Sequence, residues 1–173
     1  MEKKIPTKNY IILFVVVSLT VIGVFYARGW YNTTKEYYSR NSVMKDVVSE
    51  IKEEEIQNYS LESPNFILYV SSGQDALVKP FENSFKGIAQ KLSMQKDILY
   101  LNVDGVDKNS FINNLKNKFS LNNNVSNKIT TSSSATIYIF EEGKISKVLN
   151  NVHKYSNVQI ESILSDYGMM END

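Results

Sequence analysis

The feature that most limits how this chain can fold is an uncharged apolar stretch near its N-terminus, NYIILFVVVSLTVIGVFYA, from Asn9 to Ala27. As a helix it would be roughly 28 Å long, which is about the thickness of a bilayer's hydrocarbon core. A secretory signal peptide is the alternative, but the apolar run is long for one and no small-x-small cleavage signal follows it. We therefore predict an uncleaved transmembrane helix.

The charges that flank this stretch predict its orientation. Lys3, Lys4 and Lys8 precede it, Glu2 offsets one of them, and further basic residues follow it, so the positive-inside bias is modest. We expect a single-pass protein of the cell membrane, with its N-terminus in the cytoplasm. The expected division is a cytoplasmic tail at 1–8, an anchor at 9–31, a juxtamembrane segment with a first helix at 32–62, and an extracytoplasmic domain at 63–173.

Composition excludes several classes of function. The chain has 19 Lys and Arg against 19 Asp and Glu, so charge favours neither nucleic-acid binding nor adhesion to anionic lipid. It has no cysteine and one histidine, His153, so a transition-metal site would lack its usual ligands. Asp104 and Asp107 follow a predicted strand and could hold a cation, but turn formation explains them more simply. No cofactor, no metal and no lipidated cysteine are expected.

The region from Phe66 to Ala89 predicts a buried strand, a polar turn and an amphipathic helix. Phe66 to Val70 is a continuous apolar run, short enough for a central strand that is covered on both faces. A polar turn follows, and then apolar residues recur at helical spacing from Leu77 to Ile88. Pro80 is expected inside this helix, where it would bend the axis.

The remaining pattern predicts further helices and strands on both sides of this region. We expect a helix over Val43 to Ile51 with Ser42 as its N-cap, and a strand over Ile98 to Val103. A helix over Phe111 to Phe119 would begin at Asp107 or Asn109. The expected C-terminal elements are a mobile loop over Ser120 to Ser134, a hairpin of Ala135 to Phe140 and Lys144 to Leu149 with Gly143 in its turn, and a last helix from Val158 that Gly168 ends, before a frayed tail.

This order of elements is that of an α/β fold in which crossovers make a parallel core and a hairpin adds antiparallel strands. It resembles the thioredoxin fold over about Val43 to Tyr167. The segment ATIYIFEEGKI is similar to that family's proline-threonine-strand segment, because Thr136, the apolar run, Gly143 and Ile145 keep the family's spacing. The resemblance implies a central mixed sheet flanked by helices, here preceded by one transmembrane helix.

The family's active-site segment, C-G-P-C with a helix-kinking proline five residues later, can be laid over Ser72 to Pro80. Gly73 and Pro80 match, but the two cysteines fall on Ser72 and Asp75 and the proline between them on Gln74. Thiol-disulfide exchange needs a thiolate, so this chain alone is not expected to be an oxidoreductase. A serine without an assigned base is a poor nucleophile, and helix capping is the simpler role for this pair.

The resemblance also implies a surface for binding. The family's cis-proline falls on Ala135, and that peptide bond is expected to be trans, because a cis bond before a non-proline residue costs about 3 kcal/mol. A scaffold without its redox atoms is left with recognition, so we expect a peptide or a membrane-protein complex to dock on the former active site. We call this surface the degenerate face, and its expected residues are Ser71, Ser72, Gly73, Gln74, Asp75, Ser134 and Ala135.

Two other interpretations stay open at this point. The anchor-plus-domain layout resembles that of membrane-tethered thioredoxin-like proteins of low-GC Gram-positive bacteria, including accessory proteins of bacteriocin export. Such a redox or export accessory would position a substrate while a partner supplies the thiol. Alternatively, the chain is a structural subunit that assembles through its helix, where Gly23 and Ala27 form one small-xxx-small pair.

Overall fold

The computed structural model describes residues 7–131 and 133–170 and divides the chain into two compact units, with the boundary between Ser39 and Arg40. The unit that begins at Arg40 contains all five described strands. The sequence analysis expected the domain to begin at residue 63. Lys3 and Lys4, which belong to the expected orientation signal, lie outside the described residues. Residues 171–173, the end of the predicted frayed C-terminal tail, also lie outside them.

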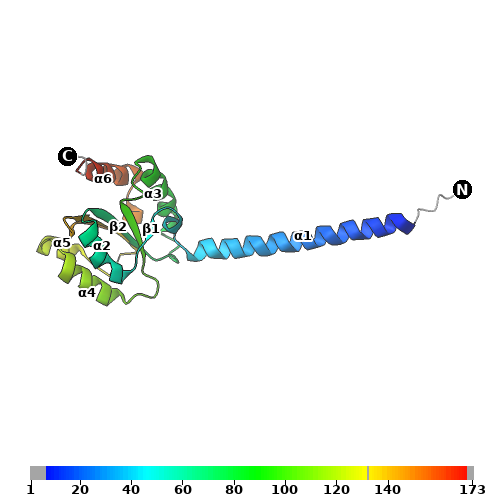
Figure 1. Ribbon diagram of the computed structural model, residues 1–173, viewed down its shortest axis with the longest axis horizontal. Helices are drawn as coiled ribbons and strands as arrows, with labels where there is room; N and C mark the ends of the chain where they lie inside the picture. Colours follow the sequence, from blue (N-terminus) through cyan, green and yellow to red (C-terminus); the bar gives the residue numbers. More distant parts are fainter. Residues whose placement is uncertain (1–6, 132, 171–173) are drawn as a thin grey trace. The chain divides into compact units, whose positions relative to one another are not determined.

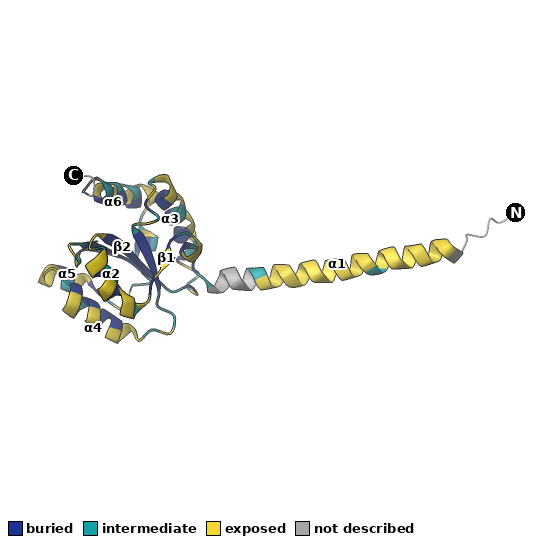
Figure 2. Ribbon diagram, in the orientation of Figure 1, coloured by how far each residue is buried: buried dark blue, intermediate teal, exposed yellow. Residues whose placement is uncertain are grey.

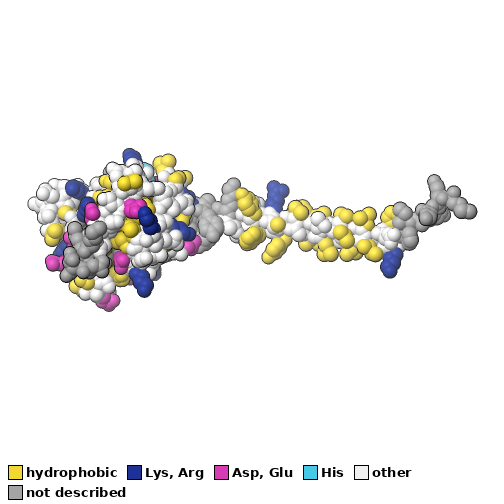
Figure 3. All heavy atoms as spheres, turned by 90° about the horizontal axis from the view of Figure 1, so that it is seen from above, with side chains coloured by type: hydrophobic (Ala, Val, Ile, Leu, Met, Phe, Trp, Pro, Cys, Tyr) yellow, Lys and Arg dark blue, Asp and Glu magenta, His cyan; other side chains and the backbone are white. Residues whose placement is uncertain are grey.

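The described part of the first unit is a long helix, α1 (Thr7–Arg40), which ends one residue past the unit boundary and whose side chains are described from Lys8 to Thr34. The part from Lys8 to Thr34 is long and apolar enough to cross a membrane. Its apolar side chains are exposed along its length (Figure 2), and they cover the helix between basic side chains in Figure 3. The helix continues into the polar segment that follows the apolar stretch.

The second unit is built on a five-stranded mixed sheet in the order β1-β3-β2-β4-β5 (Figure 1). β1, β3 and β2 are parallel, and β4 and β5 form an antiparallel hairpin beside β2. This order and these directions are those of the thioredoxin-like fold, as the sequence predicts. The strands are β1 (Ser49–Glu50), β2 (Phe66–Ser71), β3 (Ile98–Asn102), β4 (Ala135–Glu141) and β5 (Lys144–Asn150).

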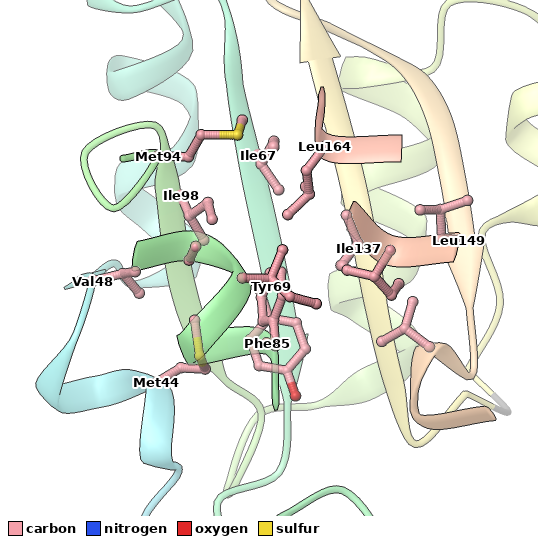
Figure 4. Close-up of a cluster of buried hydrophobic side chains, with 14 of the residues drawn as sticks. Met44, Val48, Ile67, Tyr69, Phe85, Met94, Ile98, Ile137, Leu149 and Leu164 are labelled. Atoms are coloured by element: carbon pink, nitrogen blue, oxygen red, sulfur yellow. The ribbon is translucent and has the colours of Figure 1, made fainter. Parts of the chain in front are cut away.

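Helices cover both faces of the sheet. α3 (Lys79–Lys91) and α6 (Asn157–Met170) pack on one face, and Figure 4 shows side chains such as Tyr69, Phe85, Ile137 and Leu164 meeting there. The opposite face is covered by α2 (Ile56–Glu62), α4 (Lys108–Phe119) and α5 (Asn123–Lys128). Because successive residues of β2 face opposite cores, all six of its residues are apolar or buried, which explains its continuous apolar pattern.

The predicted first helix over Val43 to Ile51 is wrong. Ser42 does cap a helical turn, since its hydroxyl accepts a hydrogen bond from the Met44 N–H, but this 3₁₀ turn ends at Asp46. Edge strand β1 follows and pairs with β3. Val48 packs in the core on one face of the sheet and Ile51 in the core on the opposite face. Residues three positions apart point in opposite directions in an extended chain, whereas in a helix they lie on the same face.

The predicted kink at Pro80 is also wrong. α3 begins at Lys79, so Pro80 lies in the first helical turn, where its missing N–H would have no intrahelical partner. Leu77 precedes the helix and is 72% exposed, so it does not belong to the buried helix face.

The other sequence predictions are mostly confirmed. Asp107 caps α4 by accepting a hydrogen bond from the Asn109 N–H at 3.1 Å. The hairpin turns through Glu142 and Gly143, whose φ angles of 52° and 74° suit a tight turn.

The predicted mobile loop is wrong in part, because α5 forms within it and buries Val125. α6 continues past Gly168 to Met170, so the glycine does not end it.

Candidate functional site

The sheet brings the two halves of the degenerate face together. In the register of β2 and β4, Ser71 is the direct partner of Ala135. Ser72 follows the end of β2 and Ser134 precedes the start of β4, so both residues lie at the same end of these two neighbouring strands. The Ser134–Ala135 peptide bond is trans, as predicted, because the described part of the chain contains no cis peptide bond. The strand register therefore brings together the two segments that the sequence overlay assigns to the degenerate face.

The loop that replaces the C-G-P-C segment is fixed by internal hydrogen bonds. The Ser72 hydroxyl donates to Asp104 Oδ1 and accepts from the Gln74 N–H at 3.2 Å, and the Gly73 N–H donates to the Asn102 side chain at 3.3 Å. The Asp75 carboxylate accepts from the Leu77 N–H at 2.9 Å. Ser72 and Asp75 thus hold turns of the loop before α3, which is a structural role. The predicted helix capping is wrong, because the N-cap of α3 is Val78, which receives no side-chain cap hydrogen bond.

The opposite side of the face is held in the same way. The Ser133 hydroxyl donates to the Ala135 carbonyl at 2.8 Å and accepts from the Asn151 N–H at 2.8 Å. The Ser134 N–H points to the Asn151 side-chain oxygen at 3.4 Å. The Ser134 N–H and the Ala135 carbonyl are therefore already engaged, by Asn151 and Ser133 respectively, and strand pairing of a peptide at these groups would have to displace these contacts.

The exposed part of the degenerate face is smaller than its sequence definition. Ser71, Gly73 and Ala135 are buried and shape the surface from below, whereas Gln74 is exposed. The adjoining exposed Leu77 was not expected there. A hollow beside Ser134 has a volume of about 30 Å³. Because small-molecule pockets occupy about 300–1,000 Å³, this hollow is too small for a typical small-molecule ligand.

The two aspartates considered for a cation have turn roles. Asp104 accepts from Ser72, and Asp107 caps α4, where hydrogen bonds from Ser110 and Asn109 lower the pKa of its carboxyl. Among residues 7–131 and 133–170, no three potential metal-ligating side chains of the His, Cys, Asp and Glu types gather into a group.

A buried carboxylate that the sequence reading did not single out lies directly beneath the face. Glu82 of α3 is 1% exposed. Its Oε1 accepts from the hydroxyls of Ser42, Tyr69 and Ser71 at 2.7, 3.0 and 3.0 Å, and its Oε2 accepts from the Val43 N–H at 2.9 Å. This cluster joins the segment after α1 to the end of β2, and we call it the Glu82 cluster.

The tyrosines around the Glu82 cluster have altered acidity. Burial and the neighbouring Glu82 carboxyl raise the pKa of Tyr69 well above its ordinary value, and burial is the main cause that raises the pKa of Tyr100 to about 12. Both phenols therefore stay protonated at neutral pH, and Tyr69 is a permanent donor to Glu82. A sequence signal for the cluster does exist, since Glu82 occupies the helical spacing of the buried Val78, Phe85 and Ala89.

Among known proteins, solved structures of two thioredoxins resemble this chain at low sequence identity. No family model matches the chain, and no curated protein does. Mitochondrial thioredoxin 3 from Saccharomyces cerevisiae is 8% identical, with a TM-score of 0.48 over 71% of this chain and 98% of that one. Thioredoxin f2 from Chlamydomonas reinhardtii is 6% identical, with a TM-score of 0.47 over 69% of this chain and 95% of that one.

At such identities a likeness concerns the fold alone, and it is the strand order and strand directions of this chain that define that fold. Both named proteins are thioredoxins, whereas this chain has no cysteine. The chain is therefore an α/β protein with a thioredoxin-like domain that lacks the sulfur atoms of thioredoxin chemistry, and with an N-terminal helix long enough to span a membrane.

Proposed function

We propose that this protein is a non-catalytic binding module, tethered to the cell membrane by α1, whose thioredoxin-like domain docks a protein at the outer face of that membrane. The tether would be the anchor at 9–31, with the tail at 1–8 in the cytoplasm. The observation that carries the proposal is the degenerate face: a thioredoxin-like active-site position whose cysteine positions are occupied by Ser72 and Asp75. Both side chains make hydrogen bonds that fix the loop, Ser72 to Asp104 and Asp75 to the Leu77 N–H.

The chemistry of the face supports recognition over catalysis. Thiol-disulfide exchange requires a thiolate, which no side chain of this protein can form. The Ser72 hydroxyl donates a hydrogen bond to the Asp104 carboxylate and accepts one from the Gln74 N–H, so it supports the loop on both sides. A loop that is fixed before binding loses little conformational entropy when a partner arrives, and this favours affinity.

The shape and polarity of the face support a protein partner. Leu77 and Gln74 are exposed beside the fixed loop, and together they offer an apolar contact next to an amide that can donate and accept hydrogen bonds. The backbone near Ser134 is engaged internally, so we propose that side chains of the loop, more than added strand pairing, make the contact.

Photocrosslinking tests this proposal in the membrane in which the protein is made. A photoreactive phenylalanine at Leu77 of the full chain should give crosslinked adducts of discrete mass, because the partner would cover this side chain. The matched control is the same amino acid at Val158, which is 77% exposed against 72% for Leu77 and lies on α6. Adducts of the same mass and yield from both positions, or none from Leu77, would contradict docking on the degenerate face.

A further inference from the structure

The segment that follows α1 along the chain, residues 41–43, is fastened to the thioredoxin-like domain by hydrogen bonds. The Ser42 hydroxyl and the Val43 N–H donate to the two oxygens of the Glu82 carboxylate, at 2.7 and 2.9 Å. The Lys79 ammonium group donates to the Asn41 carbonyl at 3.4 Å. Ser42 is only 4% exposed. The segment is therefore part of the folded domain rather than a free linker.

The same contacts reach both ends of the loop that carries the degenerate face. This loop, residues 72–78, begins directly after Ser71, whose hydroxyl donates to Glu82 Oε1 at 3.0 Å. The loop ends where α3 begins at Lys79, and Glu82 lies in the first turn of that helix. Segment 41–43 is thus joined to the residue before the loop through Glu82, and directly to the helical turn after the loop.

The hydrogen bonds at Glu82 depend on one another. Its Oε1 accepts from the hydroxyls of Ser42, Tyr69 and Ser71 at once, and its side chain is 1% exposed. If segment 41–43 leaves, the carboxylate loses two of its four donors. A buried carboxylate with too few donors moves toward water, because an unpaired charge is costly in the protein interior. Such a movement takes the carboxylate away from Ser71.

The middle of loop 72–78 is held mainly by short-range turns. Its first residues receive support from Asn102 and Asp104, and the bonds that follow lie within the loop itself. The side chains of Gln74 and Leu77 are exposed, so they add no buried apolar contact. A segment with few buried contacts opens locally at small cost, so the order of this loop is sensitive to what holds its two ends.

We propose that segment 41–43 is a latch, whose seating on Glu82 keeps loop 72–78 in one conformation. Because the chain enters the domain through this segment, a force or a partner that acts on the tether would reach the latch first. Seating and docking are then coupled: a protein on the degenerate face stabilises the seated latch as much as the seated latch favours that protein. This coupling rests on the proposed docking, which crosslinking from Leu77 tests separately.

Hydrogen–deuterium exchange with mass spectrometry tests the latch in the full chain in non-ionic micelles, without a partner. Val43→Pro removes the N–H that donates to Glu82. Proline is otherwise compatible with this position, because Val43 begins a helical turn and Ser42 before it is extended, with φ −65° and ψ 143°. Amides of loop 72–78 should exchange about ten-fold faster, as expected for the loss of a hydrogen bond to a charged group, while those of β4 should stay within about two-fold.

A second variant and a matched control separate the latch from general stability. Ser42→Ala removes another donor to Glu82, should also accelerate exchange selectively in loop 72–78, and decides the test if Val43→Pro loosens the whole domain. Ser60→Ala is the control, because Ser60 is also buried, at 6% exposed, but lies on α2 and donates to a backbone carbonyl there. It should leave loop exchange within about two-fold. Unchanged loop exchange in Ser42→Ala, or equal acceleration in the loop and in β4, would overturn the proposal.

Discussion

Replacing Glu82 with alanine should lower the free energy of unfolding by about 3–5 kcal/mol, because each buried donor left without its acceptor costs about 1–3 kcal/mol. Four donors would lose their common acceptor at once: the hydroxyls of Ser42, Tyr69 and Ser71, and the Val43 N–H. The expected loss is below the full sum because hydroxyl groups can rotate and water can enter the space. Urea unfolding of the full chain in non-ionic micelles, followed by circular dichroism, measures the change.

Two further variants make this result specific to the buried cluster. Glu82→Gln keeps the size of the side chain and one acceptor oxygen, so it should cost about half as much or less. Glu54→Ala removes an exposed carboxylate and should change stability by no more than about 0.5 kcal/mol. If Glu82→Ala were as mild as Glu54→Ala, the Glu82 cluster would not hold the end of β2 as described here.

Phe140→Ala should have a comparably large effect, a loss of about 3–5 kcal/mol, which is usual when a buried aromatic ring is removed. The Phe140 ring is fully buried, stacks on Phe66 with centroids 4.2 Å apart and meets the Phe119 ring nearly edge-on at 5.6 Å. These contacts join β4 to β2 and to α4, so the cavity would open where sheet and helix meet. The same unfolding measurement applies.

The controls for Phe140 vary size and burial separately. Phe140→Leu refills most of the cavity and should recover at least half of the lost stability. Leu121→Ala removes an apolar side chain that is 58% exposed and should cost no more than about 0.5 kcal/mol. A loss below about 1 kcal/mol for Phe140→Ala would show that the core on this face of the sheet is not packed as the ring contacts indicate.

Much of the sheet could be predicted from sequence because its strands are short apolar runs with clear ends. Phe66 to Val70 and Ile98 to Leu101 are buried on both faces of the sheet, and such strands leave a continuous apolar pattern. Edge strand β1 leaves no such pattern, because its two residues are exposed and polar. The pairing of Ser49 and Glu50 with β3 is a tertiary contact that the local sequence does not reveal. The apolar residues from Val43 to Ile51 recur at helical spacing, so the pattern predicts a helix there.

The candidate site was predictable in position but not in detail. The overlay of Gly73 and Pro80 on the thioredoxin motif places Ser72 and Ala135 at one end of the sheet, which the register of β2 and β4 bears out. The hydrogen bonds that fix the loop come from Asn102 and Asp104, which lie 29 and 32 positions further along the chain than Gly73 and Ser72, and no local pattern links them to the loop. Glu82 was missed because a glutamate in an amphipathic helix usually faces solvent.

The most direct test of a tethered docking domain is the reactivity of single cysteines, because the natural chain has no thiol that could interfere. Gln74→Cys and, as the control, Val158→Cys are made in the full chain, and both original residues are exposed. Each variant is treated with a membrane-impermeant maleimide in intact cells and again after purification in detergent. We expect both cysteines to react in intact cells, with the cysteine at position 74 slowed several-fold relative to the control and recovering after purification. Labelling of both only after lysis, or an unchanged ratio of the two rates, would contradict the account.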